Sequence, residues 1–379
     1  MEPMTPAANT GARPRVAVLF GGRSSEHSVS CVTAAGVLEA IDHSKYDVVP
    51  IGITRNGQWT LASIDPSQWS LRAETLPEVE PGEESVVLST QGSSRELVAH
   101  APGGMPRSIG RIDVVLPLLH GPFGEDGTLQ GLLEMADIRY VGAGVLASAV
   151  GMDKHYMKIV FEAAGLAVGP YEVITDRQWF GDSEACLARV SGLKFPVFVK
   201  PARAGSSMGI TRVTGPAGLP EAIEPARQHD PKVIVEAGIT GREIEVAVLQ
   251  GRGNDDPRTS QPGEVAVRDG GHDWYDFEAK YVDGAAADLS CPADLPDSVT
   301  SRVRELAAVA FDAVGAEGLS RVDFFYTPDG ELVINEINTM PGFTPISMYP
   351  QMWAKSGLPY TELIDELIAL ALERRTGLR

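Results

Sequence analysis

One predicted β-hairpin gathers four polar side chains on a single face: Arg321, Asp323, Glu336 and Asn338. Two runs rich in Val, Ile, Phe and Tyr flank the turn sequence TPDG at 327–330, in which proline presets φ and glycine accepts a positive φ. With Thr327 paired to Gly330, Arg321 lies opposite Glu336 and Asp323 lies opposite Ile334. Because side chains alternate along a strand, the four polar groups then point the same way.

Two interpretations of this face remain open from the residues alone. Two carboxylates about 4 Å apart repel by roughly 4 kcal/mol at an effective dielectric near 20, so a counter-charge is required. A hard divalent cation is one candidate, since Asp, Glu and the Asn carbonyl are oxygen ligands suited to Mg²⁺. The alternative is a cross-strand ion pair between Arg321 and Glu336, with Asp323 facing solvent.

A second candidate site combines Lys200 with the glycine- and serine-rich segment that follows it, AGSSMG at 204–209. Two glycines let backbone N–H groups approach a phosphate, and two hydroxyls add donors, although such a loop is also typical of a hairpin turn. The spacing is not that of a Walker loop, and Gly21-Gly22 lacks the GxGxxG fingerprint. A dehydrogenase is therefore disfavoured.

Other polar residues carry weaker signals. A lone lysine such as Lys154 or Lys280 is normally a solvated charge. His120 could be a base, a ligand or a structural histidine. Glu26 and Ser28 lie near a predicted helix start, where they would act first as capping residues.

Composition excludes several classes of protein. The chain has 379 residues, 43% of them hydrophobic, and a net charge of −19, which argues against nucleic acid or an anionic membrane surface as its partner. The length suggests two or three domains. No run of 18 apolar residues exists, and residues 1–13 read as a disordered leader without a signal peptide. Three widely spaced cysteines fit free thiols, so we expect a cytoplasmic protein.

The order of predicted elements changes along the chain. Buried strands at 16–20, 46–53 and 113–118, with helices after residue 28 and at 128–135, predict a parallel α/β unit. Between them, 62–110 is an excursion with two strand-like runs, 85–89 and 96–99. Strands at 196–201, 210–213, 232–236 and 243–249 with helices at 154–164 and 219–228 predict an antiparallel α+β module. A strand-poor segment at 268–296 resembles a lid, and helices at 298–314 and 360–375 follow.

Taken together, these motifs resemble the ATP-grasp ligases, and specifically the D-alanine:D-alanine ligase family. The resemblance rests on the ordered set of Lys154, Lys200 with its loop, Glu236, Glu243, and the segments 278–281, 318–323 and 335–342. It also covers 21–30 and 119–127, and thus runs from about residue 16 to the C-terminus. It favours the metal interpretation of the hairpin.

The resemblance implies a three-domain ATP-grasp fold. An N-terminal parallel, Rossmann-like α/β domain at 14–152 would bind substrate. A small antiparallel α+β subdomain at 153–242 and a C-terminal antiparallel-sheet subdomain at 243–379, with the lid at about 268–296, would hold ATP between them. Family members are commonly homodimers, so we expect one here, with small-molecule substrates as the other partners.

The resemblance also implies roles for individual residues. Those expected at ATP are Lys154, Lys200, Ser206, Ser207, Glu236, Ala237, Ile239, Glu243, Lys280 and Phe325. Those expected to hold two Mg²⁺ ions, for which Mn²⁺ could substitute, are Asp323, Glu336 and Asn338. Those expected at the amino-acid substrates or in catalysis are Glu26, His120, Ser206, Tyr281, Arg321, Asn338, Gly342 and Ser347.

The implied reaction joins two D-alanine molecules through a D-alanyl phosphate, releasing ADP and phosphate, for peptidoglycan precursors. One departure from the family is Ala237, where members often carry Lys, which bears on nucleotide affinity. Tyr281 goes with a dipeptide product, whereas relatives that make the D-alanyl-D-lactate ester replace it. The alternatives are that depsipeptide ligase, another ATP-grasp carboxylate–amine ligase, and a nucleotide-binding regulatory module without turnover.

Overall fold

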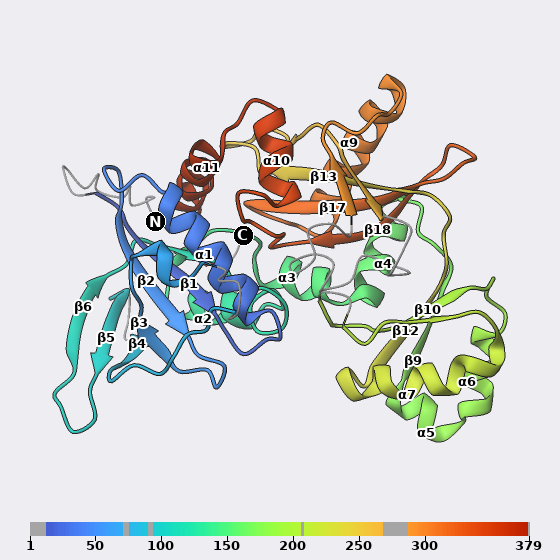
Figure 1. Cartoon of the computed structure of the whole chain (residues 1–379), viewed down its shortest axis with the longest axis horizontal. Coiled ribbons are helices and arrows are strands. Elements are labelled where there is room, and N and C mark those ends of the chain that lie inside the picture. Colours follow the sequence, from blue (N-terminus) through green and yellow to red (C-terminus); the bar gives the residue numbers. More distant parts are fainter. Residues whose placement is uncertain (1–12, 71–75, 90–93, 206–207, 268–286, 378–379) are drawn as a thin grey trace, which may run out of the picture.

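The chain folds into three parts, each built on its own β-sheet (Figure 1). The computed structural model describes residues 13–70, 76–89, 94–205, 208–267 and 287–377. In this described part, no helix is both long and apolar enough to cross a membrane. The predicted leader lies outside the described residues except for Arg13, whose guanidinium donates to the carbonyl of His43 over 2.6 Å.

The N-terminal part is the predicted parallel α/β unit. Its main sheet has the order β3-β2-β1-β7-β8, in which β1 pairs in parallel with β2 and β7, and β7 with β8. Its elements are β1 (Arg15–Gly21), α1 (His27–Ala40), β2 (Asp47–Ile53), β3 (Trp59–Leu61), the 3-10 helix η1 (Pro66–Gln68), β4 (Ser85–Leu88), β5 (Glu96–His100), β6 (Arg107–Arg111), β7 (Val114–Pro117), α2 (Thr128–Met135), β8 (Arg139–Tyr140) and α3 (Val145–Met152).

The excursion at 62–110 contains one more strand than the sequence predicted. Strands β4, β5 and β6 form a separate three-stranded antiparallel sheet. Strand β6 was missed because its sequence, RSIGR, has a single large apolar residue and therefore lacks an alternating pattern.

The middle part is an antiparallel sheet with helices beside it, as predicted. Its strand order is β11-β10-β12-β9. The elements of this stretch are α4 (Lys154–Ala163), β9 (Tyr171–Thr175), α5 (Asp176–Gly181), α6 (Ser183–Val190), β10 (Val197–Pro201), β11 (Thr211–Val213), the 3-10 helix η2 (Pro216–Gly218), α7 (Leu219–His229) and β12 (Lys232–Ala237). Helix α4 is capped by Asp153, whose carboxylate accepts from the backbone N–H groups of His155 and Tyr156.

The C-terminal part is a second antiparallel sheet, with the order β16-β15-β13-β17-β18 and the short β14 paired to β13. Its elements are β13 (Arg242–Leu249), β14 (Arg258–Thr259), β15 (Gly263–Val267), β16 (Ala287–Ser290), α9 (Asp297–Ala313), β17 (Leu319–Tyr326), β18 (Leu332–Asn338), α10 (Met348–Lys355) and α11 (Tyr360–Glu373). Strand β16 lies within the segment expected to be strand-poor, and residues 268–286 of that segment lie outside the described residues. Val267 and Ala287, which flank residues 268–286, pair with each other in this sheet.

The β17–β18 hairpin forms, but its register differs from the prediction. Asp323 lies opposite Glu336, and Arg321 lies opposite Asn338. The turn is one residue longer than expected, because the Thr327 N–H donates to the Glu331 carbonyl. This shift alone would put Glu336 and Asn338 on the opposite face of the hairpin from Arg321 and Asp323. The irregularity between Asp323 and Phe324 shifts the pairing by one more residue. The common face predicted from the sequence is therefore retained.

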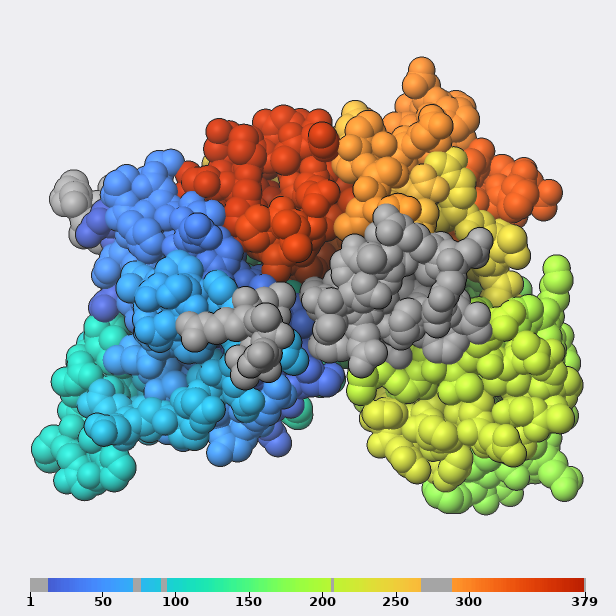
Figure 2. Space-filling view, viewed as in Figure 1, coloured from blue at the N-terminus to red at the C-terminus, as the bar shows by residue number. Residues whose placement is uncertain are grey.

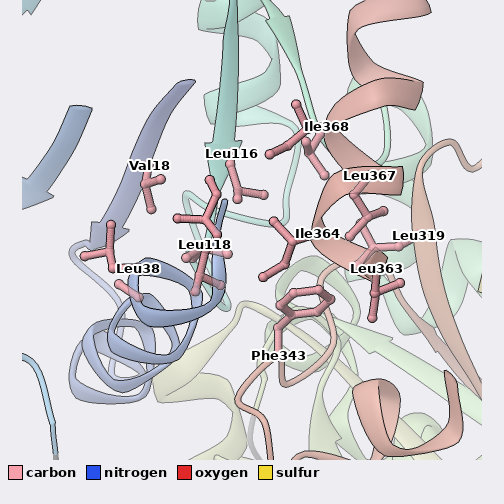
Figure 3. Close-up of a cluster of buried hydrophobic side chains, with 14 of the residues drawn as sticks. Val18, Leu38, Leu116, Leu118, Leu319, Phe343, Leu363, Ile364, Leu367 and Ile368 are labelled. Carbon is pink, nitrogen blue, oxygen red and sulfur yellow. The ribbon is translucent and has the colours of Figure 1, made fainter. Parts of the chain in front are cut away.

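The first and last parts of the chain share one hydrophobic core. Helix α11 packs against α1, β7 and β8, and its residues Leu363, Leu367 and Ile368 lie in one buried cluster with Val18 and Leu116 (Figure 3). Fully burying each such side chain contributes about 1.5–3 kcal/mol. The two parts are thus joined by packing that would be lost if they separated.

The middle part has its own smaller core around Ile174, Val199 and Ile223. Helix α4 is different, because its buried residues Met157 and Phe161 pack with the C-terminal sheet. Figure 2 shows the result as a middle lobe set apart from the N-terminal lobe, with open space between them at the lower edge of the view.

Arg374 connects three segments just after α11. Its Nη1 donates to the Tyr140 carbonyl over 2.8 Å, and its Nη2 donates to the Gly142 carbonyl over 2.7 Å and to Glu317 over 2.5 Å. The guanidinium also lies 4.6 Å from the centre of the Tyr140 ring. A single cation therefore links the chain end, the N-terminal sheet and the start of β17.

Substituting Arg374→Met should lower the free energy of unfolding by about 2–4 kcal/mol, because it leaves two carbonyls and a partly buried carboxylate unpaired. Urea denaturation monitored by circular dichroism measures the loss. Arg302→Met is the control, since the Arg302–Glu305 pair is exposed on both sides and should matter by less than about 0.5 kcal/mol. Equal losses in the two variants would contradict the connecting role of Arg374.

Candidate active site

A cavity of about 1300 Å³ lies where the three parts meet, and residues from each of them line it. Every predicted site residue within the described part of the chain is among the lining residues: Glu26, His120, Lys154, Lys200, Glu236, Ala237, Ile239, Glu243, Arg321, Asp323, Phe325, Glu336, Asn338, Gly342 and Ser347. The remaining predicted residues, Ser206, Ser207, Lys280 and Tyr281, lie outside the described residues. The predicted site residues that the structure describes thus lie around one cavity.

The polar face of the hairpin forms a compact charged network. Arg321 donates from Nε and Nη2 to the two oxygens of Asp323, both over 2.7 Å, and Asn338 Nδ2 donates to the same carboxylate over 3.0 Å. Arg321 Nε also lies 3.3 Å from Glu245 on the neighbouring strand β13. Burial acts to lower the pKa of Arg321, but Asp323 and Glu245 outweigh it and raise the pKa well above its usual value.

This network differs from the ion-pair alternative, in which Arg321 pairs with Glu336 and Asp323 faces solvent. Arg321 pairs with Asp323 on its own strand, and Glu336 lies 3.5 Å from the ammonium of Lys154. Asp323 is 14% exposed and so does not face solvent. The sequence could not show the partner of Glu336, because Lys154 lies on a helix far away in the chain.

The donor set fits a divalent cation with oxygen ligands, provided that the ligand set is completed from outside. Asp323 and Glu336 face each other across the hairpin, and Asn338 lies on the same face. Within the described residues, no group of three His, Cys, Asp or Glu side chains is already arranged around a metal position. Mg²⁺ usually binds through one or two carboxylates together with substrate phosphates, which matches such a partial site.

Cationic side chains enter the same cavity from the middle part. Lys154 Nζ donates to the Ala204 carbonyl over 3.2 Å and so contacts the predicted phosphate loop. Lys200 Nζ lies 2.5 Å from Glu236. Burial acts to lower the pKa of Lys200, while Glu236 outweighs it and raises the pKa.

Lys158 is a site residue that the sequence reasoning missed. It lies on α4 one turn after Lys154, lines the cavity, and places its Nζ 2.7 Å from the second oxygen of Glu236. The i, i+4 spacing of the two lysines was the available signal. Since both Glu236 oxygens contact lysines, the side chain of Glu236 is engaged as a counter-ion, and contact with a nucleobase would fall to its backbone.

Apolar residues lie near the expected base position. Ala237 ends β12, Ile239 follows it, and Phe325 lies opposite Glu243 in the β13–β17 pairing. An aromatic ring, an isoleucine and backbone groups at a strand end could together hold a planar heterocycle.

Glu26 projects into the cavity from the start of α1. It occupies the N-cap position, but its side chain makes no capping hydrogen bond, which corrects the capping interpretation. A Cβ built on Gly121 would lie 2.5 Å from the Glu26 carboxylate, and one built on Gly205 would lie 2.7 Å from it. Glycine at both positions therefore lets the loop after β7 and the loop after β10 approach this carboxylate.

The buried His120 and the half-buried Glu125 connect the N-terminal part to the loop after β18. His120 Nδ1 lies 3.1 Å from the Met340 carbonyl, and its Nε2 lies 3.3 Å from Thr33 Oγ1. Glu125, also missed from the sequence, accepts from the backbone N–H groups of Gly121 over 2.5 Å and Met340 over 3.1 Å. Burial lowers the pKa of His120, so a neutral ring donating from Nδ1 to the carbonyl satisfies both nitrogens.

The loop that carries Gly342 and Ser347 is held from its other side as well. Tyr360 on α11 donates its hydroxyl to the Phe343 carbonyl over 2.7 Å. Ser347 Oγ accepts from the Thr344 N–H over 3.1 Å. This loop and Arg321 both line the cavity.

Glu125 should make stability depend on pH. Burial and the nearby Glu26 raise the pKa of Glu125 to about 8. Between about pH 4.5 and pH 8 the folded protein therefore holds a proton that the unfolded chain has released. The free energy of unfolding should fall as pH rises through this range, by up to about 1.4 kcal/mol per pH unit.

The variant Glu125→Gln cannot titrate, so its unfolding free energy should fall less steeply than that of the wild type between pH 5 and pH 8. Urea denaturation across this range in metal-free buffer measures both slopes. A pH-independent difference in unfolding free energy between the two proteins reflects the changed hydrogen bonds of residue 125. Parallel curves would show that Glu125 is ionised throughout.

Solved structures share the architecture of this chain. The VanG D-Ala:D-Ser ligase from Enterococcus faecalis superimposes with a TM-score of 0.80 at 37% identity, over 95% of this chain and 100% of that one. The D-alanine-D-alanine ligase from Coxiella burnetii gives a TM-score of 0.79 at 34% identity, over 96% of this chain and 94% of that one.

Sequence comparisons agree. The chain is 71% identical over 368 residues to a D-alanine--D-alanine ligase of Arthrobacter sp. (strain FB24), covering 97% of this chain and 96% of the relative. It is 58% identical over 379 residues to a D-alanine--D-alanine ligase of Kocuria rhizophila, covering 99% of this chain and 98% of the relative. The families described as D-ala D-ala ligase N-terminus and D-ala D-ala ligase C-terminus match residues 15–143 and 160–369. The chain therefore belongs to the D-ala D-ala ligase family, whose ATP-grasp fold was predicted from its motifs.

Proposed function

We propose that the protein joins two D-alanine molecules into D-alanyl-D-alanine at the expense of ATP, releasing ADP and phosphate, as a step toward peptidoglycan precursors. The observation that carries this proposal is the single cavity that brings Glu26, Lys154, Lys200, Arg321 and the hairpin carboxylates together. Membership of the family and relatives at about 70% identity support it.

The first step activates a carboxylate, which is otherwise a poor electrophile at neutral pH. Glu26 would accept the ammonium of the first D-alanine and direct its carboxylate toward the γ-phosphate of ATP. A carboxylate oxygen attacks that phosphorus while the bond to the β-phosphate oxygen breaks, which gives D-alanyl phosphate and ADP. Lys154 and Lys200 would contact the phosphates and oppose their negative charge.

The second step forms the peptide bond. The amine of the second D-alanine, after losing a proton, attacks the acyl carbon and produces a tetrahedral intermediate with an oxyanion. Arg321 and the Gly342 backbone N–H would stabilise that oxyanion, a type of contact worth about 3–4 kcal/mol in other enzymes. Ser347 would help to hold the second carboxylate, and expulsion of phosphate completes the reaction.

Divalent metal use is implied by the family, and we propose two Mg²⁺ ions with Mn²⁺ as a substitute. Asp323, Glu336 and Asn338 would hold them. When bound, the metal would neutralise the γ-phosphate. Before that, Arg321 and Lys154 compensate these carboxylates, as their 2.7 Å and 3.5 Å contacts indicate.

The proposal is tested by measuring phosphate release from ATP and Mg²⁺ with D-alanine, L-alanine, or D-alanine plus D-lactate or D-serine, and by identifying the products by mass. We expect phosphate release when D-alanine is the only amino acid added, with D-alanyl-D-alanine as the product. D-serine is included because the structural relative from Enterococcus faecalis is a D-Ala:D-Ser ligase. An ester with D-lactate would contradict the prediction made from Tyr281, and nucleotide binding without turnover would support a regulatory module.

Removing one hairpin carboxylate should abolish turnover without unfolding the protein. In Asp323→Asn or Glu336→Gln, we expect Mg²⁺-dependent phosphate release to fall by about a hundredfold or more, because a negative charge that would bind the metal is lost. Asp329→Asn is the matched control, since Asp329 is an exposed carboxylate in the turn of the same hairpin. Wild-type activity in either site variant would contradict the metal assignment.

The expected cytoplasmic location and homodimer stay predictions. Sedimentation equilibrium of the purified protein tests the second. A mass near twice 40.4 kDa is expected, and a mass near 40.4 kDa would contradict it.

A further inference from the structure

The Glu236 carboxylate lies between two lysines inside the cavity. Lys158 Nζ is 2.7 Å from one of its oxygens, and Lys200 Nζ is 2.5 Å from the other. The side chain of Lys158 is 3% exposed and that of Glu236 is 10% exposed. All three residues line the cavity, although Lys158 lies deeper than Lys200.

The charge of this group depends on Lys158. Two cations and one anion leave a surplus of one positive charge. Without Lys158, Glu236 and Lys200 would form a neutral pair. The surplus matters because the neighbouring cations of the cavity are matched, Lys154 with Glu336 and Arg321 with Asp323.

A polyanionic ligand makes this surplus important. Carboxylates outnumber lysines and arginines among the described residues that line the cavity. A nucleotide triphosphate entering it would therefore meet repulsion unless some fixed positive charge remains. Coulomb interactions are stronger in a partly desolvated cavity than in water, so one unit of charge has a measurable effect.

We propose that Lys158 is a positioning residue of the nucleotide site: by occupying one oxygen of Glu236, it leaves Lys200 with positive charge to present to the phosphates of ATP. This inference rests on the proposed function, because it assumes that the cavity binds ATP. In this inference the Glu236 side chain balances the charge of the two lysines. Lys158 contacts no substrate but raises the affinity for ATP.

A merely structural ion pair would also place Lys158 beside Glu236, and its removal would also lower stability. The two explanations differ in how a second substitution acts. If the net charge matters, removing Glu236 as well restores the surplus of one, carried by Lys200. If packing matters, removing both partners of a buried contact brings no recovery of nucleotide affinity.

The test compares Lys158→Met, Glu236→Gln and the double variant in the full-length protein. Calorimetry gives the Kd of a non-hydrolysable ATP analogue with Mg²⁺, and steady-state kinetics give KM for ATP and for D-alanine. For Lys158→Met we expect Kd and KM for ATP to rise about tenfold, with KM for D-alanine within about twofold of the wild type. For the double variant we expect Kd to return to within about threefold of the wild type. Thermal unfolding checks that each variant folds.

Two further variants complete the design. Lys158→Arg keeps the positive charge, so its Kd for the analogue should stay close to that of the wild type. This expectation can be tested even if Lys158→Met proves unstable. Lys232→Met is the matched control, because Lys232 is another largely buried lysine that pairs with a carboxylate, Asp153, and it is not among the described residues that line the cavity. It should lower stability and leave the Kd unchanged.

Two outcomes would overturn the inference: a wild-type Kd in Lys158→Met, or a double variant that binds the analogue no better than Lys158→Met. Failure of the proposed function looks different, because the wild type itself would then neither bind the nucleotide nor form the dipeptide. The two failures are therefore distinguishable in one set of measurements.

Discussion

The constraint that shapes this molecule is the balance of charge in a cavity that is rich in carboxylates. Asp323, Glu336 and Glu236 are drawn together with too little water to screen them, and buried charges are tolerated when they are paired. Each has a cationic partner close by: Arg321, Lys154 and the two lysines at Glu236. These three carboxylates are thus compensated within the protein, with a surplus of positive charge at the Lys158–Glu236–Lys200 group.

The fold supplies these partners from distant parts of the chain. The hairpin brings the carboxylates, α4 brings Lys154 and Lys158, and β13 brings Glu245. The shared core of α11 with the N-terminal sheet fixes the first and last parts together, and His120, Glu125 and Tyr360 hold the loop after β18 from both sides. The middle part has a separate small core, so the cavity wall that carries Lys200 and Glu236 belongs to a lobe with a core of its own.

Much of this could be predicted from local patterns. The turn and the alternating strands at 318–338 identified the hairpin and its polar face, and the order of motifs identified the family. The register could not be predicted, because an irregularity at Asp323 leaves no sequence signal, and the shared face was retained since two one-residue shifts cancel. Lys158 and Glu125 were missed because their importance arises from burial and from partners more than 70 residues away.

The measurement that tests this account most directly is calorimetric titration of Mg²⁺ into the protein with and without a non-hydrolysable ATP analogue. Because Arg321 and Lys154 already compensate the hairpin carboxylates, Mg²⁺ alone should bind weakly. The analogue should strengthen Mg²⁺ binding by about tenfold or more, and Mg²⁺ should strengthen binding of the analogue by the same factor. Tight Mg²⁺ binding that the analogue leaves unchanged would contradict the account, since it would mean that the hairpin forms a complete metal site by itself.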